Sequence, residues 1–90
     1  MITYVAAAGT DEVISSSAAY LERIIVGKDV GSSVIEISNS SDDGDGNVKI
    51  HLAGSELSGV YEIGAEFNKG ICADITNQTN VSFVWKPMSQ

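Results

Sequence analysis

The sequence predicts an all-β protein, a small antiparallel β-sandwich of about six to eight strands, and three observations lead to this fold. Hydrophobic residues alternate with polar ones through most of the chain after residue 20. Val, Ile, Thr and aromatic residues dominate the alternating segments, as half-buried strands require. Segments rich in Gly, Asn, Ser and Asp separate them at short intervals, which is typical of turns between sandwich strands.

Six strands are expected in order along the chain, near residues 20–26, 34–39, 47–52, 60–67, 70–76 and 80–86. Within each strand, alternate side chains share one face of the sheet, and the hydrophobic set is expected to face the core. The predicted core residues are Ile24, Val26, Ile35, Ile37, Ile50, Ile63, Phe67, Ile71, Phe83 and Trp85. A jelly roll is one arrangement that such strands can adopt.

Residues 1–19 are compatible with three structures. Residues 1–8 and 11–17 suit strands at a sheet edge. Residues 6–8 are all Ala and suit a helix, although Gly9 would end it too early for stability. An extended arm that adds a strand to a neighbouring subunit is the third option. We expect strands here, exchanged between subunits or not, followed by a sandwich core over 20–87 and a tail over 88–90.

A chain of 90 residues forms one domain with a thin core of its own. Cys72 is the single cysteine, so no disulfide within the chain can support that core. Oligomerisation is the most natural support, and a homo-oligomer is therefore expected.

The formal net charge of −7, with five scattered Lys and Arg residues, argues against nucleic acid as a partner. No segment approaches the roughly 20 apolar residues that cross a bilayer. No basic run precedes the apolar stretch at the N-terminus, so we expect no signal peptide and synthesis in the cytoplasm.

The segment 41–47 offers Asp43, Asp45 and Asn47 at alternate positions, and such oxygen ligands suit Ca²⁺. The spacing does not match an EF-hand, because Val48 stands where its glycine belongs and Gly54 where its glutamate belongs. A solvated hairpin loop is the simpler interpretation.

No catalytic constellation is visible. His51 has no second histidine or cysteine at metal-ligand spacing, and no G-x-S-x-G elbow occurs. Glu62 and Glu66 share the polar face of one predicted strand, which is a common surface pattern. We expect a non-enzyme without cofactors. Tyr4 and Tyr20 are the candidates for an interface, where an amphipathic ring fits well.

The order of strands and turns over residues 20–87 resembles small structural proteins of tailed bacteriophages, which decorate capsids or form the bases of head or tail fibres. The resemblance lies in Leu21-x-x-Ile24-x-Val26, in Val34-x-Glu36-Ile37 before an Asp/Gly turn, and in the closing stretch from Phe67-x-x-Gly70-Ile71 to Val81-x-Phe83-x-Trp85. It implies a β-sandwich present in many copies on a virion.

We therefore expect a structural virion protein that binds the capsid surface or the head–tail machinery, with other virion proteins as its partners. The alternative is a small β-sandwich module that binds carbohydrate or Ca²⁺.

Overall fold

The computed structural model describes residues 1–5, 9–27, 33–41, 48–54, 59–77 and 80–88. These residues form strands and turns without a helix, which confirms the all-β prediction. The eight strands are β1 (Ile2–Val5), β2 (Gly9–Ser15), β3 (Ala19–Val26), β4 (Ser33–Asn39), β5 (Val48–Gly54), β6 (Gly59–Phe67), β7 (Ile71–Thr76) and β8 (Val81–Pro87).

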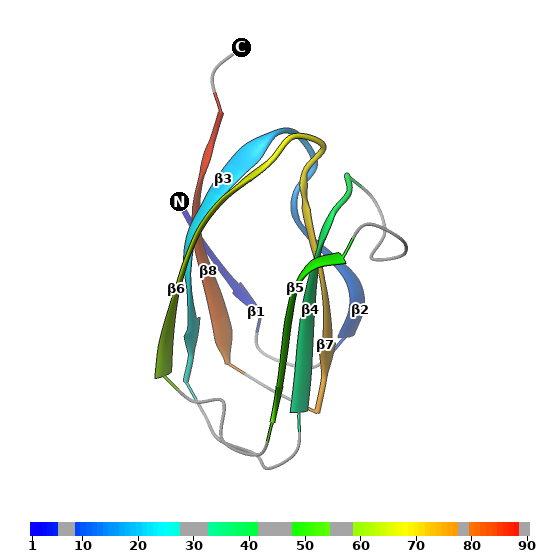
Figure 1. The fold of residues 1–90 in the computed structure, drawn as a ribbon, viewed down its shortest axis with the longest axis vertical. Coiled ribbons are helices and arrows are strands. Elements are labelled where there is room, and N and C mark those ends of the chain that lie inside the picture. Colours follow the sequence, from blue (N-terminus) through cyan, green and yellow to red (C-terminus); the bar gives the residue numbers. More distant parts are fainter. Residues whose placement is uncertain (6–8, 28–32, 42–47, 55–58, 78–79, 89–90) are drawn as a thin grey trace.

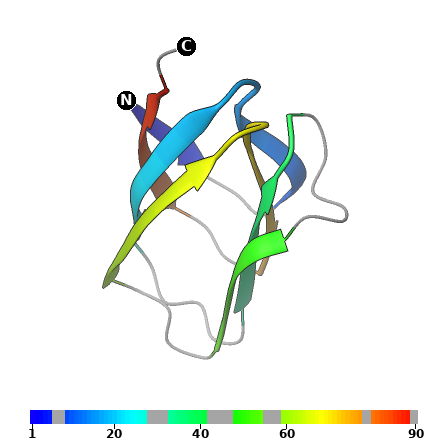
Figure 2. The ribbon, with the colours of Figure 1, turned by 45° about the horizontal axis from the view of Figure 1, so that its top comes forward.

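The strands form two four-stranded antiparallel sheets that pack face to face (Figure 1). Sheet A has the order β1-β8-β3-β6, and sheet B has the order β2-β7-β4-β5. The first four strands thus pair with the last four in reverse order, as in one long hairpin rolled up on itself. This is the jelly-roll arrangement. Figure 2 shows the two layers apart, with β3 and β6 in one and β4 and β5 in the other.

The N-terminal residues belong to both layers. β1 pairs with β8 in sheet A, and β2 pairs with β7 in sheet B. The N-terminal ammonium of Met1 donates to the carbonyl of Trp85 at 2.6 Å, and the Trp85 amide donates back to Met1 at 2.9 Å. Residues 6–8, considered above for a helix, lie outside the described residues. At the other end, the Met88 amide donates to the carbonyl of Ala18 at 3.1 Å.

The core lies between the two sheets and is closed by side chains from both. Seven of the predicted core residues are buried: Ile24, Val26, Ile35, Ile37, Phe67, Ile71 and Phe83. The other three, Ile50, Ile63 and Trp85, differ from the prediction because they are partly exposed and pack against the margin of the core. β5 and β6 are edge strands, so Ile50 and Ile63 have a neighbouring strand on one side only. Trp85 lies near the end of β8, where its indole N–H donates to Thr3 Oγ1 at 2.9 Å.

A bulge crosses sheet A at the level of Glu22. Between the pairs Leu21–Ala65 and Arg23–Glu62, β3 contributes one residue while β6 contributes Ile63 and Gly64. On the opposite side of β3, strand β8 has no residue that matches Glu22. Trp85 pairs with Leu21, and its direct neighbour Val84 pairs with Arg23. Gly64 has φ +62°, a conformation that glycine adopts without steric cost. Such bulges redirect side chains and often lie next to binding sites.

Candidate functional site

The outer face of sheet A, which points away from the core, carries large hydrophobic side chains at one end. The register places Tyr4, Ser82, Ile25 and Val60 in one row across the sheet, and Ile2 and Val84 lie in the next row. Ile2 is 70% exposed, Tyr4 and Val60 are each 58% exposed, and Ile25 is 36% exposed. We call the group of Ile2, Tyr4, Ile25, Val60 and Val84 the apolar patch.

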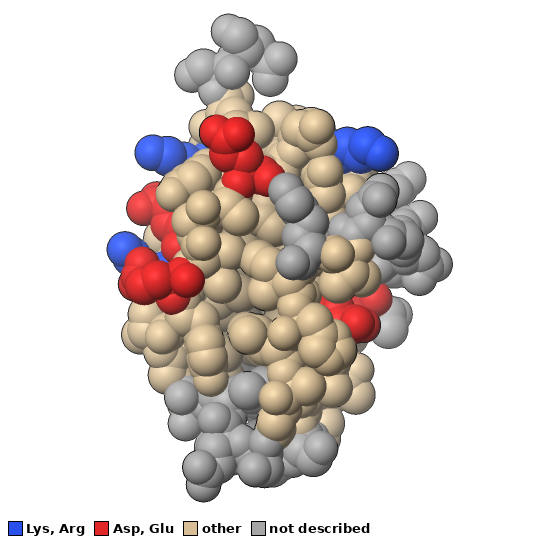
Figure 3. Space-filling view, in the orientation of Figure 1, with Lys and Arg blue, Asp and Glu red and all other residues tan. Residues whose placement is uncertain are grey.

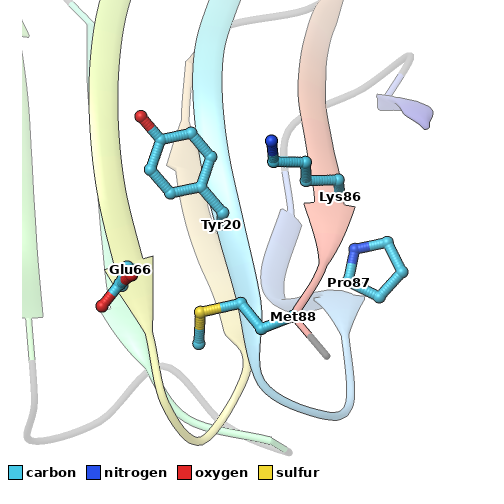
Figure 4. Close-up of a pocket in the computed structure, with 5 residues that line it drawn as sticks. All are labelled: Tyr20, Glu66, Lys86, Pro87 and Met88. Carbon is cyan, nitrogen blue, oxygen red and sulfur yellow. The ribbon is translucent and has the colours of Figure 1, made fainter. Parts of the chain in front are cut away.

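The opposite end of the same face, beyond the bulge, is polar. Tyr20 is partly exposed on β3 and aligns with Lys86 on β8 and with Glu66 on β6. Figure 4 shows its ring rising from β3 between these two side chains. The ammonium of Lys86 lies over the ring, 5.3 Å from its centre. This distance is short enough for a cation–π interaction.

Two hollows adjoin Tyr20. The larger has a volume of about 630 Å³ and is lined by Tyr20, Glu66, Lys86, Pro87 and Met88. The smaller has a volume of about 210 Å³ and is lined by Tyr20, Glu22, Arg23, Glu62, Ile63 and Gly64. Because Tyr20 lines both, its ring is a wall shared by the two hollows. We call these two hollows and their lining the Tyr20 site.

Charges of both signs surround the Tyr20 site. Arg23 Nε donates to Glu62 Oε2 at 3.1 Å, and both side chains are well exposed. Figure 3 shows acidic and basic side chains intermingled at the side of the molecule where β6 and β3 lie. The site therefore presents hydrogen-bond donors and acceptors next to one aromatic ring.

The structure brings both predicted interface residues to one face. Tyr4 lies in the apolar patch, where its hydroxyl donates to Asn80 Oδ1, and Tyr20 lies at the polar end. Ile25 and Val60 are not among the interface residues predicted from the sequence. In the alternating pattern of each strand, the adjacent positions face the core, so Ile25 and Val60 lie at outward positions. A hydrophobic residue at an outward position was the sequence signal that could have identified them.

The remaining candidate residues are the proposed calcium ligands, the single histidine and the single cysteine. Asp43, Asp45 and Asn47 lie outside the described residues. His51 Nδ1 lies 3.0 Å from Glu36 Oε2 on the exposed face of sheet B. Within the described parts of the chain, no three His, Cys, Asp or Glu side chains gather closely enough to hold a metal ion. Cys72 is buried.

Among the residues that the structure describes, no helix is long and apolar enough to cross a membrane. Comparison of the chain with protein-family models, with curated proteins and with solved structures gives no match.

Proposed function

We propose that this chain is a structural virion protein that docks onto a larger protein assembly through the apolar patch of sheet A. The assembly that we propose is the capsid surface or head–tail machinery of a tailed bacteriophage. The observation that carries the docking role is the exposure of Ile2, Tyr4, Ile25 and Val60 on one sheet face. Ile2 and Tyr4 lie on edge strand β1, Val60 lies on the opposite edge strand β6, and Ile25 lies between them on β3. Binding alone, without a catalytic step, is the role that we propose.

The size of the patch supports docking as one of many copies. Full burial of a large hydrophobic side chain contributes about 1.5–3 kcal/mol. Ile2, Tyr4, Val60 and Ile25 are between 36% and 70% exposed, so together they can contribute about 3–7 kcal/mol. Association costs about 4–15 kcal/mol in lost freedom. One patch thus binds weakly, and a chain held by several contacts, or present as an oligomer, gains avidity.

Two further observations fit this role. Jelly rolls occur in viral capsid domains, which is an analogy at the level of the fold. The net charge of −7 also favours a partner surface that is basic. A homo-oligomer, which we propose as the form that docks, would bring several patches to one surface.

Co-sedimentation tests the docking surface. Virions that lack this chain are mixed with the purified wild-type protein, with Val60→Lys and with Val13→Lys. Val13 is the matched control because it is 45% exposed on β2 of the other sheet. We expect the wild type and Val13→Lys to sediment with the particles and Val60→Lys to bind at least about tenfold less, a loss of about 1.4 kcal/mol. Equal binding by Val60→Lys, or none by the wild type, would refute the proposal.

Sedimentation velocity tests the oligomer. We expect a species larger than a monomer at micromolar concentration, and a monomer alone would contradict the homo-oligomer.

A further inference from the structure

The structure assigns a second binding site to the same sheet, at the Tyr20 site, and the ligand class that fits it is a neutral sugar. This inference goes beyond docking and uses different residues. Tyr20 and Ile25 are five positions apart on β3, which corresponds to about 16 Å along the strand. The Tyr20 ring therefore stands apart from Ile25, while the two sites adjoin where Arg23 of the smaller hollow pairs with Val84 of the apolar patch.

The aromatic ring provides the platform. Sugars have an apolar face of C–H groups and a rim of hydroxyl groups, so proteins commonly bind them with one ring and several polar side chains. Tyr20 projects from β3, an inner strand of sheet A with neighbours on both sides, so its backbone is held on either side. A ring on an inner strand is better positioned than one on a loop.

The polar side chains provide the rim. Lys86 and Glu66 line the larger hollow next to the ring, and Arg23 and Glu62 line the smaller one. Lysine and arginine donate hydrogen bonds to hydroxyl oxygens, and carboxylates accept them from hydroxyl groups. Lys86 has a long flexible stem, so its ammonium can move from above the ring to the edge of a stacked sugar.

The bulge keeps the space beside the phenol open. A Cβ atom on Gly64 would lie 3.3 Å from the Tyr20 hydroxyl oxygen, closer than ordinary contact. The φ of +62° also disfavours any other residue at this position. Gly64 therefore permits both the backbone conformation of the bulge and the position of the Tyr20 ring.

The charge balance favours a neutral ligand. The two hollows contain the cations Arg23 and Lys86 and the anions Glu22, Glu62 and Glu66, which leaves a formal balance of 2 − 3 = −1. The larger hollow alone pairs one cation, Lys86, with one anion, Glu66, so it is formally neutral and attracts neither an acidic nor a basic ligand by net charge. The larger hollow, of about 630 Å³, is broad and largely open to solvent.

Titration with defined sugars tests the site. The probes are the methyl glycosides and disaccharides of glucose, galactose, mannose and N-acetylglucosamine, added to the ¹⁵N-labelled protein at up to about 10 mM, which detects affinities weaker than 1 mM. We expect at least one probe to shift the amide signals of Tyr20, Gly64 and Lys86. Tyr20→Ala should weaken that binding at least tenfold, while Tyr4→Ala, the matched tyrosine of the apolar patch, should leave it unchanged.

Three results would overturn the inference: no shift with any probe, shifts confined to other surfaces, or equal affinity for the wild type and Tyr20→Ala. Because Tyr20→Ala removes an outward-facing side chain, an unchanged amide spectrum elsewhere verifies that the variant is folded. Glu66→Gln is a second test variant, which removes the charge of the side chain but keeps its size. We expect it to weaken sugar binding as well. None of these results depends on co-sedimentation with virions.

Discussion

Gly70 is the position where we expect a single methyl group to disturb the fold most. The residue is buried between β6 and β7 and has φ +148°. A Cβ atom there would lie 2.5 Å from the carbonyl oxygen of Ser15 and 2.8 Å from that of Ser40. Ordinary contacts begin at 3.4 Å, so the new atom is about 0.9 Å and 0.6 Å too close. Both obstacles are backbone atoms, and neither can rotate away.

The cost of Gly70→Ala has two parts. Holding alanine at this φ costs about 1–3 kcal/mol. Moving two backbone segments apart costs a further 1–3 kcal/mol or so, as overpacking does elsewhere. The alanine also restricts the unfolded chain, which offsets about 0.4–1 kcal/mol of this loss of stability. The net loss of about 1–6 kcal/mol is large, since 90 residues have a total stability of only about 5–13 kcal/mol.

Gly59→Ala separates the two parts. Gly59 has φ +131°, but no atom of the described residues lies within 4 Å of the added Cβ, so this variant carries the conformational cost without the contact. Urea unfolding followed by the fluorescence of Trp85, the single tryptophan, measures both variants. With a slope of about 1–1.5 kcal/mol per molar urea, we expect the midpoint to fall by about 2 M or more for Gly70→Ala and by about 1 M for Gly59→Ala. Equal midpoints for the two variants would refute the close approach of the backbones at Gly70.

Three other predictions concern the core and its margin. Ile37→Ala should cost about 2–5 kcal/mol because Ile37 is fully buried, whereas Ile25→Ala, on the outer face, should cost under about 1 kcal/mol in the same urea assay; similar losses would contradict the assignment of the two faces. Trp85→Phe removes the hydrogen bond to Thr3 and should cost about 1 kcal/mol, with faster amide exchange in β1 as its signature. Unchanged amide exchange in β1 would contradict the stabilising role of this hydrogen bond. Cys72 should react with a thiol reagent only as fast as the protein unfolds, and rapid labelling of the native protein would show that the residue is accessible.

The six strands after residue 20 could be predicted because their pattern is local. Alternation in segments such as Ile35–Glu36–Ile37 follows from the pleat of a single strand, whatever the strand pairs with. β1 and β2 left alternatives open, because the alanines between them suit several conformations and the choice depends on pairing with β8 and β7. Both strands are short of distinctive local signals and gain their structure from distant partners.

The candidate site likewise combines residues that the sequence predicts with an arrangement that depends on strand pairing. Tyr4 and Tyr20 could be singled out because a tyrosine is at home in an interface, but their presence on one face depends on the register of β1, β8 and β3. Ile25 and Val60 became part of the apolar patch only through the pairing of β3 with β6. The bulge at Glu22 and Gly64 likewise exists only between paired strands, since a bulge is a mismatch in register.

The sequence by itself determined the class of fold, the positions of most strands and the side chains that each strand turns inward. Only the tertiary structure decided the rolled-up order of the strands and which of them are edges, and hence that Ile50 and Ile63 stay partly exposed. It also decided that Trp85, near the end of the inner strand β8, packs at the margin of the core. The physical reason is the distance along the chain between the residues that set each feature. Alternation is set by the geometry of neighbouring residues, whereas strand order depends on hydrogen bonds between segments such as β1 and β8, which are about 80 residues apart in the chain.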